Sequence, residues 1–152
     1  MALAGLGSRG KDTYAPAAKL FPDRMKIVAI ADIDPAKVKE VADAYDVPDE
    51  SCFTSAEEMI SQPKLADVMF ITTQDQQHVG QAIKAMEKGY DLLMEKPISP
   101  DLNECREIIR VAKKTEQDCC DLPCSPLYTF LPGSETNFKE RENRGSSQCN
   151  GN

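Results

Sequence analysis

Histidine is almost absent from this 152-residue sequence, in which His78 is the only one. The six cysteines are not spaced as zinc ligands are, so we expect no metal site. No run approaches the ~18 consecutive apolar residues of a membrane-spanning helix. Basic residues are few, with 18 Lys and Arg against 25 Asp and Glu and a net charge of -7. This balance argues against a general nucleic-acid-binding protein, which needs clustered positive charge.

The first residues, Met1 to Gly5, lack the basic and long apolar regions of a signal peptide. We therefore expect a cytoplasmic location and no disulfide framework. Cys52 and Cys105 lie in patterned segments and are expected to be small buried side chains.

Strand and helix signals alternate along residues 1–117. Short apolar segments suited to strands buried on both faces of a parallel sheet lie at residues 2–4, 26–31, 52–54, 67–72 and 92–94. Segments with helical periodicity separate them, with stripes that include Tyr14, Ala17, Ala18, Phe21 and, in the last helix, Leu102, Cys105, Ile109, Ala112. The order predicts one α/β domain, a doubly wound parallel sheet with five strands and right-handed crossovers.

Several residues mark the expected helix ends. Asp34 can cap a helix whose first position is Pro35. Ser55 and Glu58 form a capping box, and Gly89 is placed to end the helix before it.

A glycine-rich turn, G-x-G-x-x-G, lies between the first expected strand and helix. Its residues, all expected to contact a dinucleotide, are Gly5, Leu6, Gly7, Ser8, Arg9 and Gly10. The first glycine permits a tight turn, the second lets the backbone approach a pyrophosphate, and the third allows close helix–strand packing. The N–H groups at the helix start face the anion. Arg9 either reaches a phosphate or is simply solvated, and the sequence leaves both open.

Asp32 ends the next expected strand, 22 residues after Gly10. A carboxylate at this position accepts hydrogen bonds from the adenosine ribose and repels a 2′-phosphate. The sequence therefore predicts a Rossmann fold that binds NAD, with NADP less favoured. The alternative is a plain glycine turn with Asp32 as a loop residue.

Two more loops follow expected strands and so belong at the carboxyl edge, where ligands of doubly wound sheets bind. The loop at 72–78 contains His78, which either contacts the cofactor or has a structural role. The second loop contains Glu95, Lys96 and Pro97, with a cis peptide expected before the proline. Lys96 could donate to a substrate oxygen or the nicotinamide ribose, although spacing alone favours a solvated lysine in a turn.

Together these segments resemble the Gfo/Idh/MocA oxidoreductases, the glucose-fructose oxidoreductase and inositol dehydrogenase family. The resemblance covers residues 2–115 and is carried by 5–10, 30–32, 73–78 and above all Glu95-Lys96-Pro97-Ile98. It implies that the three glycines and Asp32 bind the dinucleotide. It further implies that the residues lining its nicotinamide side are Thr73, Asp75 and His78. Glu95 belongs to the same cofactor-binding set, and Lys96 would lie where cofactor and substrate meet.

Members of that family continue with a sixth strand and a second domain, whose Asp-x-x-x-His motif supplies the proton-transfer histidine. The 152 residues contain no such segment, so we expect the C-terminal substrate domain to be absent. Residues 118–152 lack regular periodicity and are expected to form an irregular, disordered or non-native tail. Back-translated and read one base later, this tail resembles the family's continuation. We therefore expect a shifted reading frame after about residue 117; the alternative is an unrelated natural tail.

The function predicted from the sequence is that of an NAD-dependent oxidoreductase fragment. In the parent reaction hydride passes between nicotinamide and a sugar- or polyol-like substrate, with Lys96 as the catalytic residue. We expect this chain alone to be inactive. The alternatives are a non-catalytic dinucleotide-binding module or an inactive truncated gene product. Neither nucleic acid nor membrane is an expected partner, and a homo-oligomer is expected only with the missing domain.

The shifted frame is directly testable in the encoding DNA. We expect the frame one base beyond the present one to be open after codon 117 and to continue the family pattern. Sequencing across that codon checks this. An offset frame that is interrupted, or unlike the family, would show that the tail is unrelated.

Overall fold

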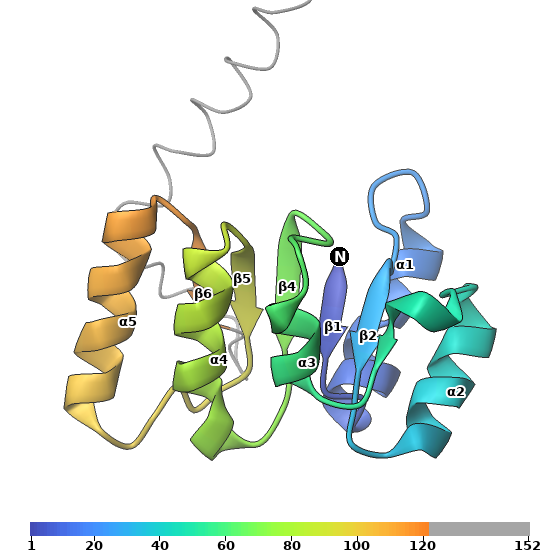
Figure 1. Cartoon of the computed structure of the whole chain (residues 1–152), viewed down its shortest axis with the longest axis horizontal. Coiled ribbons are helices and arrows are strands. Elements are labelled where there is room, and N and C mark those ends of the chain that lie inside the picture. Colours follow the sequence, from blue (N-terminus) through green and yellow to red (C-terminus); the bar gives the residue numbers. More distant parts are fainter. Residues whose placement is uncertain (122–152) are drawn as a thin grey trace, which may run out of the picture. The chain divides into compact units, whose positions relative to one another are not determined.

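The computed structural model of the chain describes residues 1–121, which contain one parallel sheet with helices on both faces (Figure 1). The strands are β1 (Ala2–Ala4), β2 (Ala29–Ala31), β3 (Cys52–Phe53), β4 (Val68–Ile71), β5 (Asp91–Met94) and β6 (Cys119–Asp121). Their spatial order is β3-β2-β1-β4-β5-β6, and every neighbouring pair is parallel. The order reverses between β1 and β4, the switch point of a doubly wound sheet. The predicted fold class is confirmed.

Helical segments connect successive strands. They are η1 (Ser8–Tyr14), a π-helix, α1 (Pro16–Leu20), α2 (Pro35–Tyr45), η2 (Asp49–Ser51), a 3₁₀ turn, α3 (Ala56–Ser61), α4 (Asp75–Glu87) and α5 (Leu102–Thr115). None of the helices within residues 1–121 combines the length and apolar character needed to cross a membrane.

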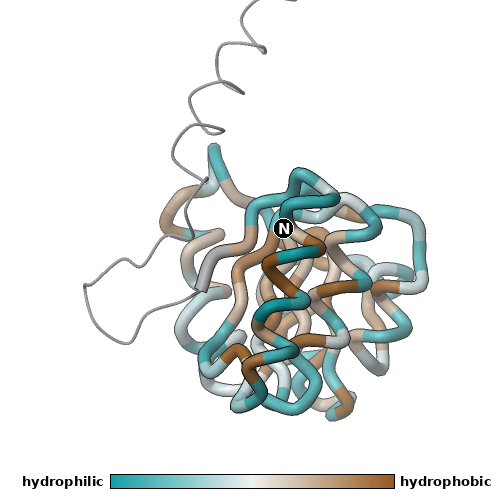
Figure 2. The backbone as a smooth tube through the Cα atoms, turned by 90° about the vertical axis from the view of Figure 1, so that its left-hand side faces the viewer, coloured by the Kyte–Doolittle hydropathy of each residue, from teal (hydrophilic) through white to brown (hydrophobic). Residues whose placement is uncertain are grey.

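The core consists of two apolar layers, one on each face of the sheet. Leu3, Ile30 and Phe70 belong to the layer that also contains residues of α1 and α2. Their strand neighbours belong to the layer of α3, α4 and α5, and on β1 and β2 these are the alanines Ala2, Ala4, Ala29 and Ala31. In Figure 2 many of the hydrophobic segments of the backbone tube lie in the middle of the fold, and many hydrophilic segments lie at its periphery. Successive residues of a strand thus point alternately into the two layers, which determines the face of the sheet that each residue occupies.

The expected helix ends are largely confirmed. The Asp34 carboxylate accepts a hydrogen bond from Ala36 N at 3.0 Å, and Pro35 is the first residue of α2. Gly89 follows α4 with φ 86°. Ser55 caps α3 through Glu58 N at 3.1 Å. The Glu58 carboxylate, however, accepts from Thr54 N at 2.9 Å, so the reciprocal half of the capping box is shifted by one residue.

Two predicted apolar stripes are wrong at one end. Phe21 is 55% exposed, whereas Ala15 is fully buried. Ala15 N donates to Gly10 O at 2.9 Å, which is the five-residue spacing of a π turn and shifts the following residues around the helix axis. In α5, Leu102 is 63% exposed, and the buried positions are Ile108 and Val111.

The structure adds a sixth strand where an irregular tail was expected to begin. Leu92 N donates to Asp118 O at 2.7 Å, and Asp118 N donates to the Asp91 carboxylate at 3.0 Å. Cys119 then pairs with Leu92. This strand forms by backbone pairing with β5. The sequence does not signal it, because residues 119–121 have no alternation of apolar and polar residues. Residues 122–152, which contain the rest of the expected tail and of the proposed shifted frame, lie outside the described residues.

Candidate functional site

The residues singled out from the sequence meet at the carboxyl edge of the sheet, at the bottom of Figure 1. Gly5, Asp32 and Glu95 directly follow β1, β2 and β5. Thr72 and Thr73 follow β4. Parallel strands end at the same edge, so four loops converge around the switch point between β1 and β4.

The three glycines of the turn have different surroundings. Gly5 has φ 90°, and a Cβ there would lie 2.5 Å from Thr72 O. A Cβ on Gly10 would lie 2.0 Å from Gly5 O. A Cβ on Gly7 would meet no atom within 4 Å. The first and third glycines are therefore required by packing within the protein, while the second leaves its backbone open to a ligand.

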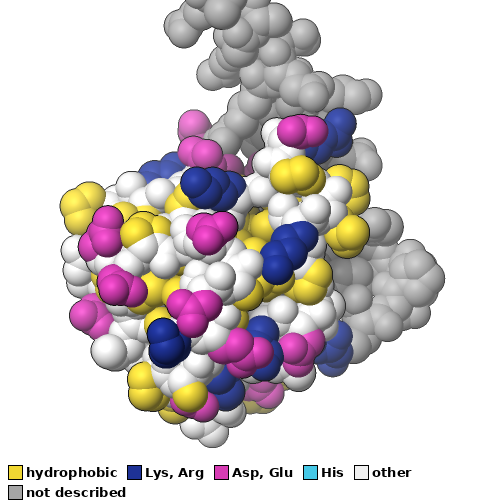
Figure 3. All heavy atoms as spheres, turned by 90° about the vertical axis from the view of Figure 1, so that its right-hand side faces the viewer, with side chains coloured by type: hydrophobic (Ala, Val, Ile, Leu, Met, Phe, Trp, Pro, Cys, Tyr) yellow, Lys and Arg dark blue, Asp and Glu magenta, His cyan; other side chains and the backbone are white. Residues whose placement is uncertain are grey.

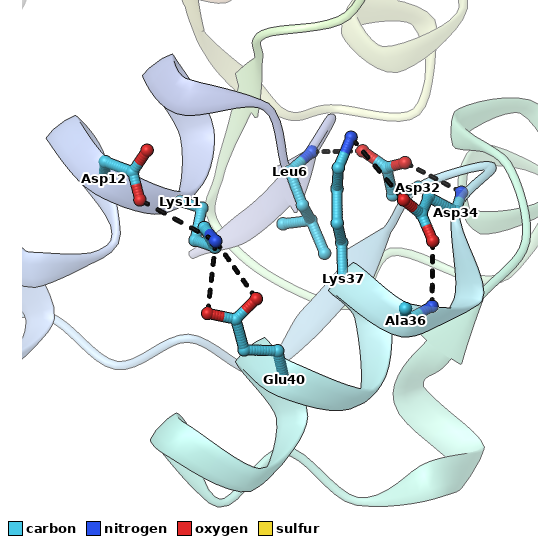
Figure 4. Close-up of polar contacts among 8 residues, drawn as sticks. All are labelled: Leu6, Lys11, Asp12, Asp32, Asp34, Ala36, Lys37 and Glu40. Atoms are coloured by element: carbon cyan, nitrogen blue, oxygen red, sulfur yellow. Dashed lines mark hydrogen bonds and ion pairs between the residues drawn. The ribbon is translucent and has the colours of Figure 1, made fainter.

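Asp32 is fixed by two backbone donors (Figure 4). Its Oδ2 accepts from Leu6 N at 2.5 Å, and its Oδ1 accepts from Asp34 N at 2.9 Å. The half-buried carboxylate thus connects the glycine turn to the start of α2. Each oxygen keeps a second lone pair, so the group can still accept a hydroxyl donor. A cavity of about 460 Å³ opens beside it, next to Ile33, whose side chain is 87% exposed.

The basic residues around this part of the site already have acidic partners. Lys11 donates to both carboxylate oxygens of Glu40, at 3.1 and 3.0 Å, and the hydrogen bond from this ammonium group raises the pKa of Lys11. Lys37 Nζ lies 3.8 Å from the Asp34 carboxylate (Figure 4). Acidic and basic side chains are interspersed across the face that Figure 3 shows. That face is therefore mixed in charge.

His78 and Gln81, one turn apart on α4, both contact Thr73 in the loop that follows β4. The Thr73 hydroxyl donates to Gln81 Oε1 at 2.6 Å. His78 Nε2 lies 3.1 Å from Thr73 O, and its Nδ1 lies 3.0 Å from Pro97 O. His78 is fully buried. Its ring therefore bridges two loops of the site from the interior, which is a structural role and one of the two that the sequence left open for His78.

Glu95 joins the glycine turn to the β5 loop. It is only 7% exposed, and its Oε1 accepts from the hydroxyl of Tyr14. Arg9 Nε lies 3.5 Å from the same oxygen, and Lys96 N donates to Oε2 at 3.1 Å. Lys96 itself is exposed, and the peptide before Pro97 is cis, as expected.

The structure brings most of the predicted residues together but distinguishes their environments. Ser8, Arg9, Asp75 and Lys96 are exposed at the edge. The Leu6 side chain is fully buried and its N–H is bonded to Asp32, so it supports the turn from within. Roles for Tyr14 and Gln81 were not predicted. Tyr14 was assigned only to an apolar stripe, and the helical spacing of Gln81 from His78 was the one available signal for its buried face.

No group of three or more His, Cys, Asp or Glu side chains within residues 1–121 is arranged to hold a metal ion.

A model of the Gfo/Idh/MocA oxidoreductase family, described as an NAD-binding Rossmann fold, matches residues 1–120. The chain belongs to this family. It is similar to the uncharacterized protein YMR315W of Saccharomyces cerevisiae, with 26% identity over 113 residues, which are 74% of this chain and 32% of that protein. It is also 29% identical over 111 residues to the human trans-1,2-dihydrobenzene-1,2-diol dehydrogenase, covering 73% of this chain and 32% of the enzyme.

Among solved structures, the chain is similar to the WlbA dehydrogenase of Chromobacterium violaceum, crystallised in complex with NADH and UDP-GlcNAcA. The TM-score is 0.72 and the identity 26%, over 80% of this chain and 34% of that protein. This chain of the Gfo/Idh/MocA family thus spans about a third of the length of these relatives.

The contrast between Gly7 and Gly10 gives a prediction for stability. Gly10→Ala is expected to destabilise the fold by about 3 kcal/mol, because the new Cβ collides with backbone. Gly7→Ala, at φ -70° and ψ -172°, is expected to cost less than about 1 kcal/mol. Urea unfolding followed by circular dichroism compares the two variants. Equal losses would contradict the different surroundings of these glycines.

Proposed function

We propose that this chain is the dinucleotide-binding part of an NAD-dependent oxidoreductase, with the cofactor lying across the carboxyl edge of β1, β2, β4 and β5. The observation that carries the proposal is the open backbone at Gly7, flanked by glycines whose Cβ positions are filled by the protein. This is the arrangement needed for close approach of a pyrophosphate. The residues present therefore fit the cofactor that the family implies.

The pyrophosphate would be held by the glycine turn. The N–H groups at the start of η1 precede any residue to which they could bond within the helix, so they favour an anion. Gly7, Ser8 and Arg9 provide this surface. The buried residues Gly5, Leu6 and Gly10 support this surface through their packing within the protein.

Asp32 would hold the adenosine ribose. Its carboxylate is positioned by Leu6 N and Asp34 N before any ligand arrives, and its remaining lone pairs can accept the ribose hydroxyls. A 2′-phosphate would face the same negative charge, which disfavours NADP. The adjacent exposed Ile33 and the cavity beside it offer apolar surface to the adjoining base.

The nicotinamide side would lie over the loops that follow β4 and β5. Thr73 and Asp75 would line it, and Glu95 would support it from its buried position. When bound, the nicotinamide supplies the hydride chemistry. The exposed Lys96 ammonium would orient and polarise a substrate oxygen at the end of β5. Similarity to a dehydrogenase crystallised with a UDP-sugar supports a sugar- or polyol-like substrate for the parent reaction.

His78 favours a second proposal, that this chain binds the dinucleotide without turnover. It is the one histidine of the sequence, and its ring is buried between two backbone carbonyls. It is therefore not placed to exchange a proton with a substrate. Under this proposal the chain acts as a non-catalytic dinucleotide-binding module.

Cofactor choice tests the role of Asp32. We expect calorimetric titration to show NAD binding at least about tenfold tighter than NADP binding, since one carboxylate beside a 2′-phosphate costs on the order of 1–2 kcal/mol. Asp32→Asn should reduce the ratio to within about threefold. Asp34→Asn is the matched control, because it removes a neighbouring charge and keeps a good helix cap. An unchanged ratio in Asp32→Asn would exclude Asp32 from specificity.

Turnover separates the two proposals. We expect the chain to bind NAD but to produce no NADH above background with a panel of polyols and UDP-sugars, because residues 1–121 provide no histidine placed for proton transfer. Absorbance at 340 nm measures this, with an intact dehydrogenase of the family as positive control. NADH production by this chain would show that it is catalytically sufficient.

A further inference from the structure

Glu95 is an unusual group for the interior of this fold. Among residues 1–119, it is the only buried carboxyl group. Burying a carboxylate is costly unless donors surround it. Here its partners come from two different segments: Arg9 lies in the glycine turn and Tyr14 ends η1, whereas Lys96 N belongs to the β5 loop. Glu95 therefore links the proposed pyrophosphate site to the proposed nicotinamide side.

The two members of the Arg9–Glu95 ion pair differ sharply in exposure. The Arg9 side chain is 51% exposed, and that of Glu95 is 9% exposed. The contact is also long, with Nε at 3.5 Å from Oε1. Because the Arg9 side chain is half exposed, water can hydrate its guanidinium group when the contact with Glu95 is broken. Glu95 would then keep the Tyr14 hydroxyl and Lys96 N as donors, so its burial stays compensated.

The position of Arg9 gives it a second partner. It lies two residues after Gly7, whose backbone is open, and at the start of η1. A phosphate bound there would offer an arginine short, charge-assisted and bidentate hydrogen bonds, which are stronger than a single contact at 3.5 Å. Two anions thus compete for one guanidinium.

We propose that Arg9 exchanges partners, from Glu95 in the ligand-free chain to the pyrophosphate when a dinucleotide binds. This inference rests on the proposed function. The exchange couples the two halves of the site, because the same Glu95 carboxylate accepts from Lys96 N. Occupation of the glycine turn changes the charge balance directly beside Lys96. Arg9 is then a binding residue, and Glu95 is a positioning residue that transmits occupancy.

ADP is the appropriate probe, because it has the pyrophosphate and adenosine but no nicotinamide, and adenosine is its phosphate-free control. By calorimetry, Arg9→Gln should weaken ADP binding about tenfold and leave adenosine binding unchanged. Glu95→Gln should strengthen ADP binding about fivefold, because Arg9 no longer leaves a charged partner. In the double variant this gain should disappear. Lys11→Gln, which removes a nearby charge paired with Glu40, should change ADP affinity less than twofold.

A second measurement stands if Glu95→Gln fails to fold. In the wild-type chain, the Arg9 Nε–H resonance, assigned by its loss in Arg9→Gln, should shift on saturation with ADP and not with adenosine. A resonance that stays in place, or a Glu95→Gln variant that loses ADP affinity as Arg9→Gln does, would overturn the exchange while NAD binding persists. A wild-type chain that binds neither NAD nor ADP would overturn the proposed function itself.

Discussion

The architecture depends on one close contact between two stretches of backbone. Gly10 lies so near Gly5 that a single methyl group would overlap the Gly5 carbonyl oxygen. This contact brings η1 onto the end of β1, beside Thr72, whose hydroxyl lies 2.9 and 2.7 Å from the carbonyl oxygens of Ala4 and Gly5. The turn, the first helix and the β4 loop are thereby fixed as one unit. Gly7 lies between these two tightly packed glycines, and a Cβ at Gly7 itself would meet no atom within 4 Å.

Polar side chains connect the remaining loops to this unit. Asp32 ties β2 to the turn, Glu95 ties β5 to η1, and His78 ties the β5 loop to the β4 loop. The bonds of Asp32 to Leu6 and of Glu95 to Tyr14 join segments far apart in the sequence. A site assembled in this way is largely formed before a ligand binds, which lowers the ordering cost of association.

Local signals made the fold and the outline of the site predictable. Apolar runs, Asp34, Pro35 and Gly89 act through their own backbone or nearest neighbours, so sequence spacing is enough to recognise them. Their position after the fifth expected strand placed Glu95 and Lys96 at the ligand edge, and the resemblance added their roles at the cofactor and the substrate. The π turn after Gly10, the pairing of Cys119 with Leu92, and the bonds of Tyr14 and Gln81 depend on tertiary geometry. No periodicity in the sequence encodes them, and Tyr14 therefore stood out only as an apolar residue.

The alanines on one face of β1 and β2 make the two sides of the sheet unequal in their tolerance of substitution. Ala2, Ala4, Ala29 and Ala31 are fully buried toward the layer of α3, α4 and α5, so even one added methylene there would force helices away from the strands. Leu3 and Ile30, on the opposite face, can exchange for side chains of similar volume. Substitutions are thus better tolerated on the α1–α2 side of the sheet. On the opposite side the small alanine side chains fix the distance between the strands and the helices α3, α4 and α5.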